Sequence, residues 1–270
     1  MPDVIIIPAG AETDEQYHRS GAWGSTLIGH FRRSPKLAHL IRTGQHQPKP
    51  TASMTFGRWF HHLMDRGFPF TATFRQGPDV DRRTKAWTAA VEEATKDHIT
   101  LIPHDDWLAL YAMRESVLGN GVARGLLEGA EQEVGFRMSS PYGNFQLQCR
   151  ADVLRRWTLL SDLKTTADVD DFAHSVRTYG YHRQAVLYQW IVSQAGGELL
   201  PFSFIAAEKD GPLYRCRVFD LDPVLLEQGW SEVETALIEI GERTAKGDWN
   251  DHRDADIVTA QGWPRSGAAA

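Results

Sequence analysis

The sequence predicts an α/β fold in which a central mixed β-sheet is flanked by helices and preceded by a helical N-terminal region. Amphipathic helical patterns fill the first half of the chain, and strand patterns alternate with helical ones in the second half. With 270 residues, 42% of them apolar, the chain can bury a substantial core. No linker or repeat divides it, so we expect one domain over 1–270, with a mainly helical part over 21–128, a core over 129–250 and flexible ends at 1–20 and 264–270.

The composition excludes several classes of protein. No apolar run approaches the roughly 18–20 residues that span a bilayer, and the run at 4–7 is too short for a signal peptide. Cys149 and Cys216 stand alone, which argues against a disulfide framework, a zinc site or an iron–sulfur cluster. We therefore expect a soluble, cytoplasmic protein without a membrane partner. The net charge of −6 still allows nucleic-acid binding, because a local basic groove can bind DNA on an acidic protein.

Helices are predicted throughout the first half of the chain. Ser25 is placed to cap a helix over 26–33, and Pro35 opens a second helix that closes at Gly44. Further helical patterns cover 52–66, 82–97 and 105–128, the last of them interrupted at Gly119–Gly121.

The second half reads as strands joined by helices. The predicted elements are, in order, a strand at 129–138, a β-hairpin over 144–166, helices at 168–177 and 181–197, strands at 200–208 and 212–221, and a helix at 222–245. A hairpin followed by a helical crossover into further strands is typical of a mixed sheet.

The predicted hairpin carries charged residues inside its apolar pattern. In its first strand, Asp152 alternates with an apolar row and so points to the opposite face. In its second strand, Asp162 and Lys164 are two residues apart and point the same way, roughly 6–7 Å apart along the strand. If the two strands pair, two carboxylates and one ammonium group meet on one patch.

Such a patch suits phosphodiester hydrolysis, which needs a hard cation held by carboxylates, a positioned water and positive charge near the phosphate. Asp152 and Asp162 offer cation ligands, and Lys164 can orient or activate the water and offset negative charge. Glu131 or Glu133, in the preceding strand, offers a third acid. The D-x-K tripeptide alone is a weak indication, because exposed strands often pair Asp with Lys across one face.

A longer stretch, LLSDLKTTADVDDFAHSVRTYGYHRQAVLYQWIV, resembles the nuclease core of the RecE-type (exodeoxyribonuclease VIII-like) phage and prophage exonucleases, within the PD-(D/E)xK superfamily. Its DLKTTAD followed by Y-x-x-Q-x-x-x-Y is far more specific than the acids alone. Upstream, GSTLIGHFRRSP resembles the Ser-rich first helix of that family, and FGRWFH resembles its G-x-x-[FW]-H helix. The likeness implies a restriction-endonuclease-like core with a central sheet between helices.

The resemblance implies roles for individual residues. Glu131 is favoured over Glu133 as the third acid, because it lies five residues before Phe136, as the acid of that family does before its aromatic residue. The implied catalytic residues are Glu131, Asp152, Asp162, Lys164, Gln184 and Tyr188. The implied ligands of one or two Mg²⁺ or Mn²⁺ ions are His61, Asp152, Asp162 and the backbone carbonyl of Leu163. The residues expected to contact DNA are Ser25, Arg32, Arg33, Arg58, Tyr181 and Arg183.

The implied function is a metal-dependent exonuclease that degrades linear double-stranded DNA from 5′ to 3′. It would leave 3′ single strands for a RecT-like annealing protein, act as a ring-shaped homo-oligomer, and belong to a phage or prophage inside a bacterial cell. Two alternatives remain: an endonuclease or structure-specific nuclease on the same core, and a non-catalytic DNA-binding module on a nuclease fold.

Overall fold

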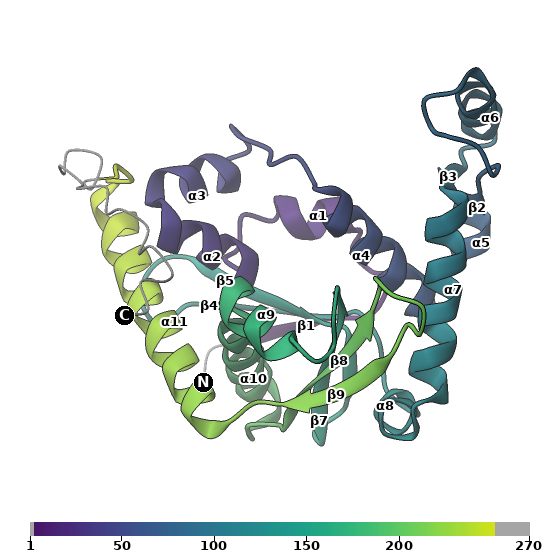
Figure 1. Ribbon diagram of the computed structural model, residues 1–270. Helices are drawn as coiled ribbons and strands as arrows, with labels where there is room; N and C mark the ends of the chain where they lie inside the picture. The colour runs from purple at the N-terminus through teal and green to yellow at the C-terminus, as the bar shows by residue number, and fades with distance from the viewer. Residues whose placement is uncertain (1–2, 252–270) are drawn as a thin grey trace, which may run out of the picture.

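A four-stranded mixed sheet carries the second half of the chain in the computed structural model, which describes residues 3–251 (Figure 1). Its order is β6-β7-β8-β9, and only the β7–β8 pair is parallel. The strands are β6 (Val153–Arg155), β7 (Leu159–Thr166), β8 (Phe202–Glu208) and β9 (Cys216–Asp220). Because parallel neighbours cannot be joined by a tight turn, β7 and β8 are connected through the helices α9 (Phe172–Tyr179) and α10 (Tyr181–Gly196).

A second, antiparallel sheet has the order β1-β4-β5 and consists of β1 (Val4–Ile7), β4 (Val134–Ser139) and β5 (Gln146–Ala151). Residues 4–7 and the helix α1 (Asp14–Arg19) form regular structure where the sequence predicted a flexible start. The apolar residues 4–7 complete the edge of β4, with Val4 opposite Met138 and Ile7 opposite Gly135, which satisfies their backbone groups. The other predicted flexible end, 264–270, lies outside the described residues.

Most of the predicted helices are present with shifted ends. They are α2 (Ser25–Arg33), α3 (Pro35–Arg42), α4 (Ala52–Met64), α6 (Lys85–Lys96), α7 (His104–Gly119), α8 (Gly121–Leu127) and α11 (Pro223–Lys246). Ser25 is the first residue of α2 and not its cap, which is Gly24. The predicted break before Gly121 is confirmed, because the side chain of Asn120 accepts hydrogen bonds from the amides of Val122 and Ala123 and so starts α8.

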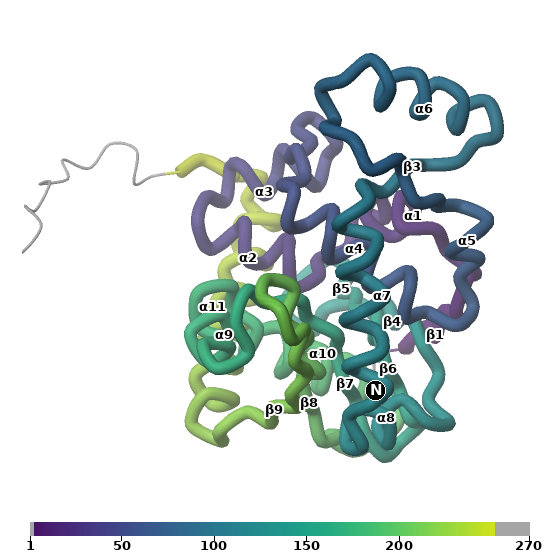
Figure 2. Tube along the Cα trace, turned by 45° about the vertical axis from the view of Figure 1, so that its right-hand side comes forward, coloured from purple at the N-terminus to yellow at the C-terminus, as the bar shows by residue number. Residues whose placement is uncertain are grey.

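A small arm combines the predicted helix α6 with three short elements that were not predicted. It consists of the short helix α5 (Phe70–Thr73) and a parallel pair formed by β2 (Phe74–Gln76) and β3 (Thr100–Ile102), with α6 between the two strands. Figures 1 and 2 both show α6 standing away from the two larger sheets. Strands of three residues give too short a pattern to be recognised in a sequence.

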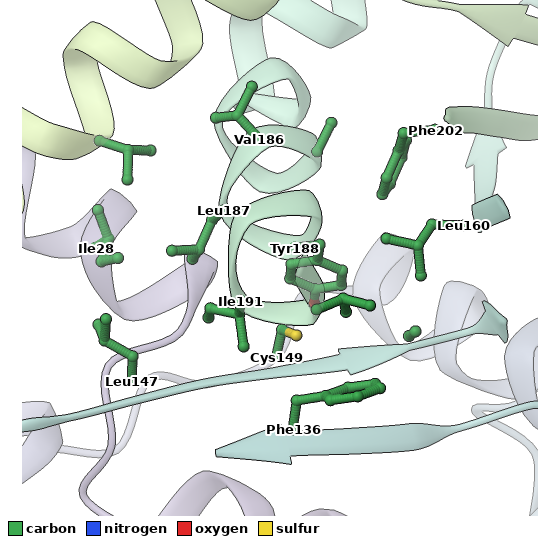
Figure 3. Packing of buried hydrophobic residues seen from close by; sticks show 14 of the residues in the cluster. Ile28, Phe136, Leu147, Cys149, Leu160, Val186, Leu187, Tyr188, Ile191 and Phe202 are labelled. Atoms are coloured by element: carbon green, nitrogen blue, oxygen red, sulfur yellow. The ribbon is translucent and has the colours of Figure 1, made fainter. Parts of the chain in front are cut away.

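Two hydrophobic clusters cover opposite faces of the mixed sheet. Leu160 and Phe204 belong to the first cluster, which also holds the buried side of α10; Figure 3 shows part of it, around Tyr188. Leu163 and Ile205 belong to the second cluster, together with residues of α4, α7 and α8. The α/β class with helices on the sheet faces is therefore confirmed. Within residues 3–251, no helix combines the length and apolarity needed to cross a bilayer.

Candidate functional site

The chain passes from the antiparallel sheet to the mixed sheet at Asp152, and the candidate site lies at this point. On one side of this residue, β5 pairs with β4; on the other, β6 pairs with β7. The β6–β7 ladder ends at Val153 opposite Ser161, and beyond it the amide of Leu163 donates a 2.8 Å hydrogen bond to Oδ2 of Asp152. A side chain thus replaces a backbone partner, and this fixes a largely buried carboxylate beside β7.

Glu133, the residue before β4, reaches the same point through an irregular backbone. Its φ of 54° is left-handed, a conformation that costs a non-glycine residue about 1 kcal/mol or more. This residue interrupts the ladder between the Glu131–Leu154 bridge and the Val134–Ala151 pair. As a result, the carboxylate of Glu133 lies next to Asp152.

Glu131 points elsewhere, so the structure places Glu133, and not Glu131, beside Asp152, while the catalytic role of either acid stays a prediction. The side chain of Glu131 is 45% exposed and forms a two-pronged ion pair with the guanidinium of Arg156. In a regular strand, residues 131 and 133 would share one face, and the spacing to Phe136 could not separate them. The left-handed turn at Glu133 separates them.

His61, Glu133 and Asp152 form a group that could hold a metal ion. One ligand atom from each lies within 4.8 Å of the other two. Nδ1 of His61, near the end of α4, is 3.4 Å from Oδ2 of Asp152. Two carboxylates and one imidazole suit a hard or borderline divalent cation.

The electrostatics of this group also fit a cation. Burial, followed by the negative charge of Asp152, raises the pKa of Glu133 to about 8, although Arg150 opposes the shift. Crowded carboxylates of this kind repel one another, and a bound divalent cation would relieve that repulsion. The donor set therefore fits the metal that the sequence implied.

Asp162 and Lys164 form a buried ion pair next to this group. Asp162 is 2% exposed; one of its oxygens pairs with Nζ of Lys164, and the other accepts a 2.6 Å hydrogen bond from Nε2 of Gln184. Burial and the neighbouring Asp152 raise the pKa of Asp162 to about 6. Burial alone would lower the pKa of Lys164, but the carboxylates of Asp162 and Asp152 outweigh it and raise that pKa, so the lysine stays charged.

Leu163 lies between these two charged residues but faces the other way. Its side chain packs in the second hydrophobic cluster, as strand alternation predicts, and its amide binds Asp152. The role of its carbonyl as a metal ligand stays a prediction.

The two tyrosines predicted on α10 occupy different environments. The ring of Tyr181 covers Nζ of Lys164, with 4.8 Å between the nitrogen and the ring centroid. Tyr188 is buried in the first cluster, as Figure 3 shows, where its ring meets that of Phe202 edge to face. Burial holds the pKa of Tyr188 well above its usual range. Its contacts are those of a core residue, and its catalytic role stays a prediction.

The side chains expected to contact DNA also divide into groups. Arg32 of α2 and Arg183 of α10 both bind Oε2 of Glu232 on α11, at 2.6 and 2.8 Å. Arg33 and Arg58 are exposed. Arg58 lies near enough to His62, the neighbour of His61, to lower its pKa, after the larger effects of burial and other neighbours. Only an exposed arginine of this kind is available to a phosphate without giving up an internal ion pair.

Sequence reasoning missed the residues that support Glu133. Arg150 contacts Oε2 of Glu133 at 3.0 Å and Oδ1 of Asp14 at 2.6 Å, and its guanidinium lies 4.7 Å from the ring centroid of Tyr17. Arg150 stands two residues before Asp152 on the polar side of its strand, which could have pointed to it. Nothing in the sequence indicated that α1, which carries Asp14 and Tyr17, docks here.

Comparison with known proteins identifies the family and supports the fold. The model of a family described as a PDDEXK-like domain of unknown function (DUF3799) matches residues 24–255, which is most of the chain. No curated protein matches the chain significantly.

Among solved structures, a "Putative exonuclease" from Eubacterium rectale is similar with a TM-score of 0.65 and 14% identity, over 93% of this chain and 96% of that one. At this identity the likeness shows a common fold. A phage related exonuclease from Haemophilus somnus matches over 76% of this chain and 99% of that chain, also at 14% identity, with a TM-score of only 0.30.

Proposed function

Because this chain belongs to the family of PDDEXK-like domains, we propose that it is a metal-dependent nuclease that degrades linear double-stranded DNA from its ends. One observation carries the proposal: His61, Glu133 and Asp152 meet at the split between the sheets, directly beside the buried Asp162–Lys164 pair. A general structural role would not require so many buried charges in one place, because each is costly to remove from water.

His61, Glu133 and Asp152 would hold Mg²⁺ or Mn²⁺, with Asp162 next to them. Such a cation, when bound, offsets charge on the scissile phosphate and lowers the pKa of a water molecule. Lys164 remains protonated, so we assign it to hydrogen bonding and charge stabilisation at the phosphate, and not to removing a proton. Gln184 fixes the orientation of the Asp162 carboxylate through its 2.6 Å hydrogen bond.

The finer features of the proposal rest on the resemblance to the RecE-type exonucleases. These are 5′ to 3′ polarity, a 3′ single-stranded product, an annealing protein as partner, a ring-shaped homo-oligomer, and a place in the bacterial cytoplasm as a phage or prophage protein. The exposed Arg33 and Arg58 would contact backbone phosphates, which makes cleavage independent of sequence and sensitive to salt.

The deciding experiment compares 5′-phosphorylated linear duplex with covalently closed circular DNA, in Mg²⁺ and in EDTA. We expect metal-dependent loss of the linear DNA alone, and no loss with Asp162→Asn. Ser203→Ala is the matched control, since Ser203 is a polar residue of the adjacent strand that pairs with Asp220 on β9. Cutting of the circle would identify an endonuclease instead. Binding without any cutting would identify a non-catalytic module.

A further inference from the structure

Tyr179, the last residue of α9, is exposed although it lies on the buried side of its helix. It stands three residues after Val176 and seven after Phe172, and both of these are buried, so the three side chains share one face. Tyr179 is nevertheless 67% exposed. Its ring therefore extends into solvent at the end of α9, and we call this exposed Tyr179 ring the aromatic ledge.

Ring contacts connect this ledge to the catalytic lysine proposed above. The ring centroids of Tyr179 and Tyr181 are 5.7 Å apart, and Nζ of Lys164 lies 4.8 Å from the centroid of Tyr181. Phe172 and Phe204 hold the Tyr181 ring in place, with centroids 5.9 and 5.7 Å away. The ledge is thus separated from the candidate site by a single fixed ring.

A positive charge lies at the same turn. A Cβ atom built on Gly180 would stand 2.0 Å from Nη2 of Arg183, so the guanidinium occupies the space over that glycine. Gly180 joins α9 to α10 and has a φ of 72°, which only glycine adopts at little cost. Glu232 holds Arg183 in position. Because Arg183 is already paired with Glu232, the part of this turn that can bind a nucleotide is the open aromatic face of Tyr179, which is suited to stacking a single base.

We propose that Tyr179 is the stacking platform for an unpaired nucleobase beside the scissile bond, and that the protein therefore prefers DNA ends whose last base pair is open. This inference rests on the proposed nuclease function. A base in a duplex is held by its neighbours and its partner, so it can lie on Tyr179 only after leaving them. An end that is already open does not incur that cost.

The test is steady-state cleavage of two linear duplexes that differ only in whether the terminal pair is matched or mismatched. The wild-type protein should show the lower KM on the mismatched end. Tyr179→Ala should raise this KM about tenfold, the size of one base–aromatic stack, and leave kcat within about twofold. Tyr179→Phe should retain the wild-type KM, because the ring and not the hydroxyl makes the stack.

Trp157→Ala is the matched control. Trp157 is also an exposed aromatic residue, at 40%, but it precedes β7 at the end away from Lys164. Its loss should leave the KM for both ends unchanged. A second measurement reports stacking directly: in an Asp162→Asn background, 2-aminopurine at the open end should be quenched on binding, and Tyr179→Ala should abolish the quenching.

The outcomes separate this inference from the function on which it rests. If the wild-type protein cleaves linear DNA but Tyr179→Ala keeps both the KM and the quenching, the stacking platform is wrong and the nuclease stands. Equal losses with Tyr179→Phe and Tyr179→Ala would also refute stacking, since they would assign the effect to the hydroxyl. If the wild-type protein cleaves no DNA, both proposals fail.

Discussion

Asp162 and Leu163 are consecutive residues of β7, each 2% exposed, and they face opposite sides of the sheet. Leu163 packs among apolar side chains of the second cluster. Asp162 carries a carboxylate that needs Lys164 and Gln184 as partners. Equal burial therefore has opposite meanings on the two faces. Burial of Leu163 stabilises the fold, whereas burial of Asp162 opposes it, as expected of a group that serves the proposed chemistry.

The pKa of Asp162 shows that Lys164 only partly offsets the cost of burying this carboxylate. Lys164 pulls this pKa down, yet burial and the charge of Asp152 still raise it to about 6. A buried group whose charged form remains unfavourable despite a direct ion pair indicates a functional site more than a structural one.

The largest expected effect is on activity, and it should distinguish Asp162 from Leu163. Asp162→Asn keeps the shape of the side chain and removes its charge, so we expect cleavage of linear DNA to fall by about 10³-fold or more. Leu163→Ala should do the reverse. It should lower the free energy of unfolding by about 2–5 kcal/mol and leave kcat per folded molecule unchanged. Nuclease assays and thermal unfolding of both variants provide the measurement. A Leu163→Ala protein that folds but cannot cleave DNA would contradict the assignment of Leu163 to stability and Asp162 to activity.

The next effect concerns the positive charge beside Asp162. Lys164→Met preserves most of the side chain's volume but removes the ammonium group, so we expect kcat to fall by about 10²-fold. DNA binding should persist, because the exposed arginines remain. Lys209→Met, on a half-buried lysine that contacts Ser53, is the matched control and should cleave normally. Full activity of Lys164→Met would remove the lysine from the mechanism.

A smaller effect should separate the two glutamates. Glu133→Gln weakens the group that includes His61 and Asp152, so we expect the Mg²⁺ concentration for half-maximal activity to rise about 10-fold or more. Glu131→Gln removes only the exposed ion pair with Arg156 and should leave this Mg²⁺ concentration unchanged. The opposite ranking would restore Glu131 as the third acid.

Strand alternation sufficed to predict much of this site. It placed Asp162 and Lys164 on one face and Leu163 on the other, and it turned Asp152 away from the apolar row, all before any tertiary contact was known. The regular period of two residues is a local property of the chain, and in β7 it places Leu160 in the first cluster and Leu163 in the second.

The remaining features depend on events that a local pattern does not encode. Glu133 enters the site through one left-handed backbone angle, which also turns Glu131 away. Arg32 and Arg183 form ion pairs with Glu232, which lies far along the chain on α11. The arrival of α1 beside Arg150 likewise depends on distant pairing. Such long-range choices require the assembled fold.

The smallest expected effect is on stability and concerns the protonation of Glu133. Burial and Asp152 raise its pKa from the ordinary 4.5 to about 8. Between these values Glu133 binds more protons in the folded state than in the unfolded chain, so the contribution of this residue to stability falls as the pH rises from about 4.5 to 8. Glu133→Gln removes this group, and its melting temperature should therefore decline less across that range than that of the wild-type protein.

Added Mg²⁺ should sharpen the same contrast. Because the cation binds ionised carboxylates, it should raise the melting temperature of the wild-type protein more at pH 8.5 than at pH 6, and raise that of Glu133→Gln little at either pH. Glu131→Gln, whose altered side chain lies outside the group, should behave as the wild-type protein does. Identical pH slopes for Glu133→Gln and Glu131→Gln would show that the strained residue 133 does not bring a second carboxylate to Asp152 in solution. The candidate metal group would then be reduced to His61 and Asp152, beside the Asp162–Lys164 pair.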